Sequence, residues 1–166
     1  MIKAIVCVDE NWAIGNNNDL LFKLPLDMKF FRETTLWSTV ICGRKTLESF
    51  PGGKPLKNRS TICLCSEENK RDDCYCVHSI DECKSLIKEL SKTQNVFIIG
   101  GGSVYKALLD LCEMIYVTKV KADGNGTVYF PNLDEHPDFE LYNNSGDTED
   151  GEYVVNFCTY ISKRIN

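Results

Sequence analysis

The chain has 166 residues, a length that suits one domain with a well-buried core and is short for two. Hydrophobic residues make up 43% of it and charged residues 26%, which argues against a disordered or fibrous protein. The net charge is -5 and Lys and Arg are spread along the chain, so the sequence lacks the basic footprint of a nucleic-acid-binding protein.

The first residues and the cysteine count bear on the compartment. Residues 1–10 form a short apolar run with one lysine and two acids at its end, which predicts neither a cleavable signal nor a membrane span. The nine cysteines are an odd number. Without a secretion signal, an odd number favours reduced thiols, and we expect a cytoplasmic protein.

Short apolar runs with β-branched residues, each followed by turn or helix-start residues, are typical of buried strands. In chain order, they predict strands over residues 2–8, 39–42, 60–65, 74–77, 95–99 and 114–120. The last third has no helical pattern. Residues 139–143 and 153–162 are predicted to pair as antiparallel strands, joined by an acidic loop over residues 146–152.

Helices are predicted between these strands. Pro25 opens the first one, which continues over residues 26–34 with Met28 and Phe31 on its core-facing stripe. A second helix covers residues 81–91. Ser103 is predicted to cap a third that runs to Leu111. Alternating strands and helices indicate a single α/β domain over residues 1–166, with a mainly parallel sheet covered on both faces and an antiparallel edge.

Cys63, Cys65, Cys74 and Cys76 form two C-x-C pairs within predicted strands. Zinc ligands are usually spaced as C-x2-C or wider, whereas residues two apart in a strand share one face. Packing of the two strands is therefore the favoured interpretation, and a metal site is the minor alternative.

Two glycine-containing segments follow predicted strands, where ligands bind in open α/β sheets. In Gly43-Arg44-Lys45-Thr46, a glycine, two cations and a hydroxyl suit a dinucleotide pyrophosphate, although an exposed basic helix start fits as well. Gly100-Gly101-Gly102 allows close approach of the backbone to a ligand. It is not the Rossmann fingerprint, because Tyr105 stands where that pattern needs its last glycine, and a tight structural turn explains it equally well.

Asp27 is the candidate centre of the chemistry. It lies in the first turn of the helix opened by Pro25, where an acid can simply favour the helix dipole. A carboxylate among apolar side chains is costly unless it is hydrogen-bonded, so a functional Asp27 needs donors from a ligand. An aminopyrimidine-like ring edge offers two N–H groups at a suitable spacing.

Taken together, four segments in this order strongly resemble dihydrofolate reductase: Trp12–Gly15, Leu24–Asp27, Val40–Thr46 and Ile98–Tyr105. Tyr116–Thr118 and Tyr129–Pro131 resemble later signatures of that family, so the resemblance runs from Met1 to about Pro131. It implies an eight-stranded mixed sheet with helices on both faces. It also implies NADPH as cofactor, reduction of 7,8-dihydrofolate to 5,6,7,8-tetrahydrofolate, and a monomer.

The resemblance also implies roles for residues of the substrate site. Asp27 would hold the amino group and ring N–H of the pteridine, with Thr118 as its hydrogen-bond partner, and Phe22 would stand near the reacting ring. Arg59 would receive the α-carboxylate of the glutamyl tail, because a planar guanidinium suits a carboxylate better than an ammonium does. The other implied substrate-site residues are Ile5, Val6, Met28, Phe31, Arg32, Phe50, Leu56, Ile99 and Tyr105.

For the cofactor, the resemblance implies that Arg44 and Ser66 meet the 2′-phosphate, while Lys45, Thr46 and Ser103 lie near the pyrophosphate. It further implies a cis peptide between Gly100 and Gly101. The other implied cofactor-site residues are Cys7, Ile14, Gly15, Leu20, Gly43, Leu64, Cys65, Ile99, Gly101, Gly102, Val104 and Tyr105.

The sequence departs from the family at three places. Leu21-Phe22 replaces a Pro-Trp pair whose indole could order a water, Thr127 replaces an aspartate that could bridge to the mobile loop, and Ser103 replaces an arginine found in some relatives. The loop over residues 9–23 is expected to close and exclude water. These changes affect that closure.

Two rival functions share the fold. A pyrimidine reductase of riboflavin synthesis would not need Asp27 or Arg59, and a folate-binding protein without turnover would bind without oxidising NADPH. We expect the acidic run 147–152 to be a solvated turn. His78 and His136 are expected to be loop or surface residues away from the site.

Overall fold

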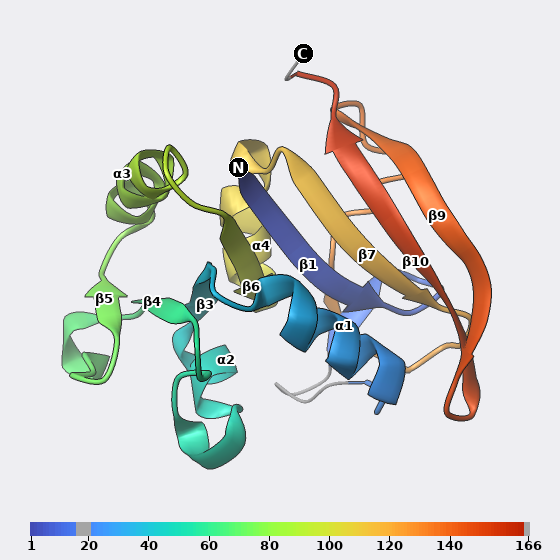
Figure 1. The fold of residues 1–166 in the computed structure, drawn as a ribbon, viewed down its shortest axis with the longest axis horizontal. Helices are drawn as coiled ribbons and strands as arrows, with labels where there is room; N and C mark the ends of the chain where they lie inside the picture. Colours follow the sequence, from blue (N-terminus) through green and yellow to red (C-terminus); the bar gives the residue numbers. More distant parts are fainter. Residues whose placement is uncertain (16–20, 165–166) are drawn as a thin grey trace.

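An eight-stranded sheet runs through the centre of the protein in a computed structural model, which describes residues 1–15 and 21–164 (Figure 1). Across the sheet, its strands are β5 (Tyr75–Val77), β4 (Ser60–Leu64), β3 (Thr39–Gly43), β6 (Val96–Gly100), β1 (Ile2–Val8), β7 (Met114–Val120), β10 (Tyr153–Ser162) and β9 (Phe139–Asp150). The pairs from β5 to β7 are parallel, and β10 is antiparallel to both of its neighbours. The predicted α/β fold, a mostly parallel sheet with an antiparallel C-terminal strand, is confirmed.

Helices cover both faces of this sheet. On one face, Phe30 of α1 (Pro25–Thr35) and Leu47 of α2 (Arg44–Glu48) pack on a buried cluster that includes Ile5 and Ile99. On the other face lie α3 (Ile80–Leu90) and α4 (Gly102–Leu108). Short 3-10 helices, η1 to η3, cover Pro51–Gly53, Glu67–Asn69 and Leu109–Leu111. No helix in the described residues is long and apolar enough to cross a membrane.

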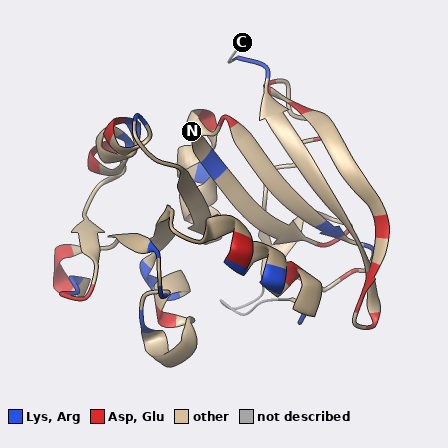
Figure 2. Ribbon diagram, viewed as in Figure 1, with Lys and Arg blue, Asp and Glu red and all other residues tan. Residues whose placement is uncertain are grey.

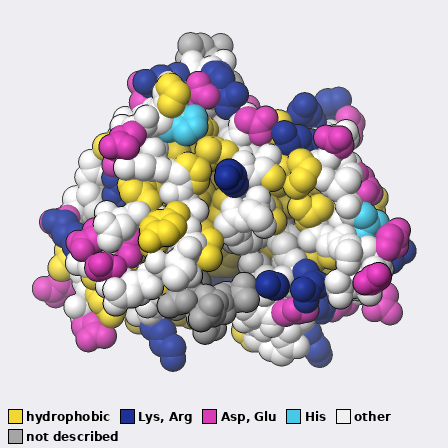
Figure 3. Space-filling model, turned by 180° about the vertical axis from the view of Figure 1, so that it is seen from behind, with side chains coloured by type: hydrophobic (Ala, Val, Ile, Leu, Met, Phe, Trp, Pro, Cys, Tyr) yellow, Lys and Arg dark blue, Asp and Glu magenta, His cyan; other side chains and the backbone are white. Residues whose placement is uncertain are grey.

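The surface is mixed. On the side opposite to the view of Figure 1, hydrophobic side chains gather near the centre and most charged ones lie around the rim (Figure 3). Large exposed hydrophobic side chains, such as Trp37, Tyr75, Tyr129 and Tyr142, come from different segments of the chain.

Two predictions about the helices are wrong. Ser103 does not cap α4, because the helix already starts at Gly102, with Gly101 as the N-cap residue and no side-chain cap. Met28 does not face the core. It is 55% exposed, and Thr35 is the buried residue of α1. Phe30 and Phe31 are the α1 side chains that pack against the buried cluster on this face of the sheet.

The predicted loop over residues 146–152 is also wrong. Strand β9 continues to Asp150, which pairs with Tyr153, so the connection is a two-residue turn of Gly151 and Glu152. Gly151 has a φ of 62°, which suits the first position of such a turn. Gly146 instead lies at a bulge, where two residues of β9 face Phe157 alone.

A second, two-stranded sheet of β2 (Ala13–Gly15) and β8 (Val128–Tyr129) was not predicted from the sequence. It is held by Asp9, which is 2% exposed. One oxygen of Asp9 accepts hydrogen bonds from the backbone N–H groups of Asn11 (2.8 Å) and Ala13 (2.9 Å), and the other accepts from Gly124 (2.9 Å). Asp9 therefore ties the start of the 9–23 loop to the segment before β8.

Replacing Asp9 by alanine is expected to lower the free energy of unfolding by about 2 to 4 kcal/mol, because backbone N–H groups lose a charged acceptor. Urea denaturation measures this change. Glu10→Ala, at the exposed next position, is the control and should stay within about 0.5 kcal/mol of the parent. A loss of less than about 1 kcal/mol for Asp9→Ala would contradict the structural role of Asp9.

Candidate functional site

The carboxylate of Asp27 lies where α1 meets strands β1 and β7. Thr118 donates a hydrogen bond of 2.6 Å from its Oγ1 to Asp27 Oδ1. Cys7 is the register partner of Thr118 on the neighbouring strand, and its thiol lies next to the Asp27 carboxylate. The two adjacent strands therefore bring a hydroxyl and a thiol to the same acid.

The surroundings of Asp27 disfavour its ionised form. Burial raises the pKa of Asp27 above its usual value, and the hydrogen bonds from Thr118 and Cys7 offset this only in part. The negative charge of Asp150 raises the pKa further. Burial, with Asp27 as the next cause, also raises the pKa of the Cys7 thiol well above its usual range, so the thiol stays protonated as a donor. A perturbed acid of this kind is typical of a functional site.

Asp150 is a site residue that the sequence prediction missed. The acidic run was expected to be solvated, but Asp150 is 1% exposed and accepts hydrogen bonds from the backbone N–H groups of Leu26 (2.9 Å) and Asp27 (3.0 Å). The available signal was Gly151, because a glycine at the first position of a two-residue hairpin turn would have placed Asp150 at the end of a strand.

Several apolar residues expected at the substrate site lie together. Ile5 of β1 and Ile99 of β6 are buried in one cluster, against which Phe31 and Phe50 pack. Leu56 is half-buried in the segment after η1. Val6 belongs to the cluster on the other face of the sheet. The cluster around Ile5 and Ile99 therefore forms an apolar wall beside α1.

Arg59 is held by three acceptors next to the C-terminal half of α1. Its Nε donates to Thr35 Oγ1 (2.8 Å), and its terminal nitrogens donate to the carbonyl groups of Lys57 (2.6 Å) and Arg32 (2.5 Å). Burial and the neighbouring Arg32 lower the pKa of Arg59, yet a guanidinium remains charged at neutral pH. No carboxylate among the described residues forms an ion pair with Arg59.

The two glycine segments meet beyond the ends of β3 and β6. A Cβ atom on Gly101 would lie 3.4 Å from Thr46 Oγ1, and one on Gly43 would lie 3.2 Å from Val104. The peptide between Gly100 and Gly101 is cis, as predicted. Tyr105 lies under Gly100 and donates a 2.6 Å hydrogen bond to the Ile5 carbonyl, which links the glycine turn to the wall of the substrate site.

Ser66 and Arg44 follow adjacent strands at one end of this region. Cys65 extends the pairing of β4, since its N–H donates to the Val77 carbonyl (3.0 Å), and Ser66 is exposed next to it. Arg44 forms an ion pair with Glu48 at 2.9 Å. The expectation that His78 lies away from the site is wrong, because its Nδ1 is 2.8 Å from the Cys65 carbonyl.

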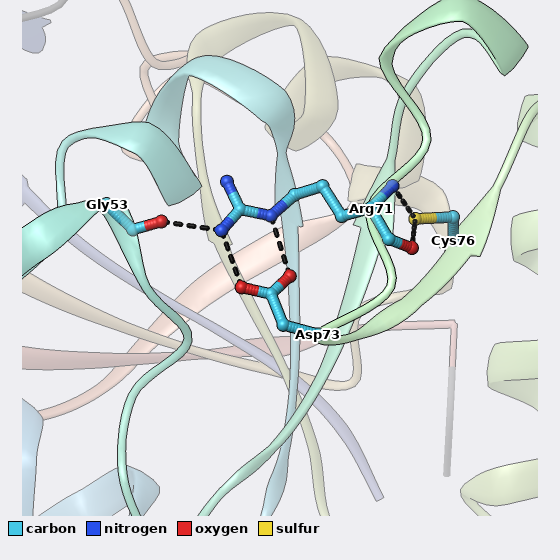
Figure 4. Close-up of polar contacts among 4 residues, drawn as sticks. All are labelled: Gly53, Arg71, Asp73 and Cys76. Atoms are coloured by element: carbon cyan, nitrogen blue, oxygen red, sulfur yellow. Dashed lines mark hydrogen bonds and ion pairs between the residues drawn. The ribbon is translucent and has the colours of Figure 1, made fainter.

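The connection between β4 and β5 is anchored by Arg71 (Figure 4). Its guanidinium pairs with Asp73 through contacts of 2.8 and 2.7 Å and donates to the Gly53 carbonyl at 2.6 Å. The backbone N–H of Arg71 donates to Cys76 Sγ at 3.3 Å. These contacts fix the segment that carries Ser66 against the turn after α2.

The cysteines pack as predicted. Cys63 pairs in register with Cys42 and Cys76, and Cys65 and Cys74 lie in or against the same buried cluster. Burial raises the pKa of Cys65 and of Cys74, so these thiols are weak nucleophiles. No group of three or more His, Cys, Asp or Glu side chains in residues 1–15 and 21–164 is arranged to hold a metal ion.

The remaining expected residues lie around Asp27 and around the two glycine segments. Phe22 packs edge to face on Tyr153, with ring centroids 4.8 Å apart. A Cβ atom on Gly102 would lie 2.5 Å from Val128 and 3.7 Å from Ile14, so β2 and β8 border the glycine turn. Leu20 lies outside the described residues. Gly15, Lys45, Leu64 and Ser103 lie on β2, α2, β4 and α4.

Charged side chains of both signs border the region. Lys and Arg mark the start of α2 and the segment after it, α1 carries both signs, and acidic residues mark β9 and its turn into β10 (Figure 2). Cations at Arg44 and Lys45, hydroxyls at Thr46 and Ser66, and an accessible glycine backbone are the donor set that a phosphate-rich dinucleotide needs.

Comparisons with known proteins agree with this geometry. A family model described as dihydrofolate reductase matches residues 1–164. The dihydrofolate reductase of Bacillus subtilis (strain 168) is 33% identical over 166 residues, which cover 98% of this chain and 95% of that protein. The dihydrofolate reductase of Staphylococcus haemolyticus is 34% identical over 131 residues, 78% of this chain and 76% of that protein.

A solved structure gives the same result for the fold. Dihydrofolate reductase from Enterococcus faecalis, complexed with NADP(H) and RAB-propyl, matches with a TM-score of 0.85 and 30% sequence identity, covering 98% of this chain and 96% of that one. Because the family model spans nearly the whole sequence and the fold agrees, the chain belongs to the dihydrofolate reductase family.

Proposed function

We propose that this chain reduces 7,8-dihydrofolate to 5,6,7,8-tetrahydrofolate with NADPH, and that Asp27 anchors and polarises the pteridine. The observation that carries the proposal is a partly buried carboxylate, bonded to Thr118 at 2.6 Å and set beside an apolar wall. An acid in such a place is costly unless a ligand supplies further donors.

The pteridine lies against Ile5, Phe31 and Ile99, with its amino group and ring N–H directed at Asp27. Thr118 holds one carboxylate oxygen, which fixes the rotation of the carboxylate and leaves it facing the ring. Phe50 and Leu56 complete the apolar wall, and the exposed Met28 borders its open side.

Arg59 receives the α-carboxylate of the glutamyl tail. The contacts with Thr35, Lys57 and Arg32 orient the guanidinium before any ligand arrives. A pre-oriented planar cation binds a carboxylate through two parallel hydrogen bonds at a low entropic cost.

The residues around the glycine turn fit NADPH. When bound, NADPH supplies the hydride for the carbon of the substrate C=N bond. Arg44 and Ser66 bind the 2′-phosphate, with His78 beside them, and Thr46 and the Gly101 backbone bind the pyrophosphate. The support is the close approach of Thr46 to Gly101 and the position of His78 next to Cys65.

The ring nitrogen next to the reduced carbon takes its proton from water. Asp27 is already bonded to Thr118 and, in this proposal, to the pteridine edge, so it acts by polarising the ring. Closure of the loop over residues 9–23, of which residues 16–20 lie outside the described residues, is expected to exclude other water. At position 127, where the carboxylate is missing, the backbone N–H of Thr127 donates to the Gly15 carbonyl at 2.9 Å and ties the two segments without a side chain.

The protein works as a monomeric single domain in the cytoplasm. All nine cysteines are free thiols, as suits a reducing compartment.

Asp27→Asn is expected to lower the rate of NADPH oxidation with dihydrofolate by roughly a hundredfold or more near neutral pH. The rate should partly recover in acid, where the substrate is protonated before it binds. A pH profile that matches the parent would contradict the role of Asp27. The control is the free energy of unfolding of the variant. Because the pKa of Asp27 is raised in the folded protein, ionisation of Asp27 destabilises the fold as the pH rises past that pKa. Asp27→Asn should therefore be at least as stable as the parent at neutral pH.

Arg59→Lys should raise the KM for dihydrofolate by roughly tenfold or more with little change in kcat, because lysine cannot form the paired hydrogen bonds. Steady-state kinetics measure both constants. A pterin without the glutamyl tail is the control substrate, and its kinetics should be unaffected. Equal losses with both substrates would show that Arg59 acts elsewhere.

Arg44→Gln should reduce the preference for NADPH over NADH, as the ratio of the two kcat/KM values, by roughly tenfold or more. Lys88→Gln, which removes an exposed cation from α3, is the matched control and should leave the ratio unchanged. An unchanged ratio for Arg44→Gln would remove Arg44 from the 2′-phosphate site.

A further inference from the structure

The first turn of α1 has no cap from its own segment. Its N-cap residue is Leu24, which offers no side-chain acceptor, and Pro25 follows at the first helical position. The N–H of Met28 donates to the Leu24 carbonyl at 2.9 Å. The N–H groups of Leu26 and Asp27 therefore need an acceptor from elsewhere.

Asp150 supplies that acceptor from a distant part of the chain. Its Oδ1 accepts from Leu26 and its Oδ2 from Asp27, so one carboxylate satisfies two successive N–H groups. The residue ends β9 at the turn into β10, and its charge lies at the favourable end of the helix dipole. The hairpin that carries it lies beside the start of α1 (Figure 1).

This arrangement separates two tasks that one acid could not perform together. An acid in the first turn of a helix usually serves the helix itself. Here Asp150 serves the helix, and the Asp27 side chain is bonded to Thr118 on β7 instead. The position of Asp27 is thus fixed from two sides. Thr118 of the sheet holds its carboxylate, and Asp150 of the hairpin holds its backbone N–H.

We propose that Asp150 is a positioning residue for dihydrofolate reduction: by capping α1 from the β9–β10 turn, it holds the Asp27 carboxylate in place for the pteridine. The inference rests on the proposed role of Asp27. Asp150 acts through Asp27 and through the backbone of α1.

The two carboxylates also interact by charge. The negative charge of Asp150 raises the pKa of Asp27, after burial as the larger cause. The other groups that face Asp27 are the Cys7 thiol from β1 and the Thr118 hydroxyl from β7, while Tyr105 of α4 has its own pKa raised by burial and, to a lesser degree, by Cys7 and Asp27. Removing the charge of Asp150 therefore lowers the pKa of Asp27.

The test is Asp150→Asn, which keeps one oxygen acceptor and removes the charge. The first readout is the pKa of Asp27 in the protein without ligands, from the pH titration of its 13C carboxyl signal, assigned by comparison with Asp27→Asn. We expect this pKa to fall in Asp150→Asn. The second readout is kinetic: kcat/KM for dihydrofolate should fall roughly tenfold, and the KM for NADPH should not change, because its proposed site lies at α2 and α4.

Glu149→Gln is the matched control, since it removes one negative charge from the preceding, exposed position of β9. It should change neither readout. An unchanged Asp27 pKa together with parental kinetics in Asp150→Asn would overturn the proposal, as would equal effects of Glu149→Gln. If the asparagine variant does not fold, Asp150→Ser takes its place.

The two readouts separate this proposal from the proposed function. If the titration shifts as expected but the unaltered protein does not oxidise NADPH with dihydrofolate, the capping role stands and the reductase function fails. If the unaltered protein turns over normally and the titration does not shift, only the role of Asp150 fails.

Discussion

The hydrogen bond between Thr118 and Asp27 joins the middle of the sheet to the first turn of α1, and the proposed substrate half of the site is arranged around it. It holds a carboxylate that burial alone would push towards its neutral form. The Cys7 thiol on the next strand lowers the pKa of the same acid, and Asp150 fixes the backbone of the same turn. Loss of any one of these contacts changes where the acid points, or how easily it ionises.

The proposed cofactor half depends on a different constraint, the close approach of two backbone turns. The segment after β3 and the segment after β6 come together because those strands are neighbours in a parallel sheet, and both end at the same edge. Thr46 lies against Gly101, and Gly102 has no room for a side chain beside Val128. Tyr105, through its bond to the Ile5 carbonyl, connects this half with the wall of the substrate half.

Local pattern was sufficient for most strands of the main sheet, because apolar runs with β-branched residues have few other uses; β1, β7 and β10 have the predicted ends. Asp27 and the glycine segments could be singled out since their spacing matches a family. The contacts that join remote segments could not be predicted. The bonds from Leu26 and Asp27 to Asp150 span more than a hundred residues, and the pairing of β2 with β8 depends on Asp9 and on turn geometry. His78 was misplaced for the same reason, because nothing in the local sequence shows that β5 ends beside Cys65.

The most direct test of Asp27 as the pteridine anchor is the protonation state of a bound 2,4-diaminopyrimidine. The ligand would be 15N-labelled in its ring, and its NMR shift measured in complex with the unaltered protein and with Asp27→Asn. A carboxylate facing the ring nitrogen should keep that nitrogen protonated well above the pKa of the free ligand, and Asp27→Asn should abolish the effect. A bound ring that is unprotonated in the unaltered protein, or equally protonated in both proteins, would contradict the central role of Asp27.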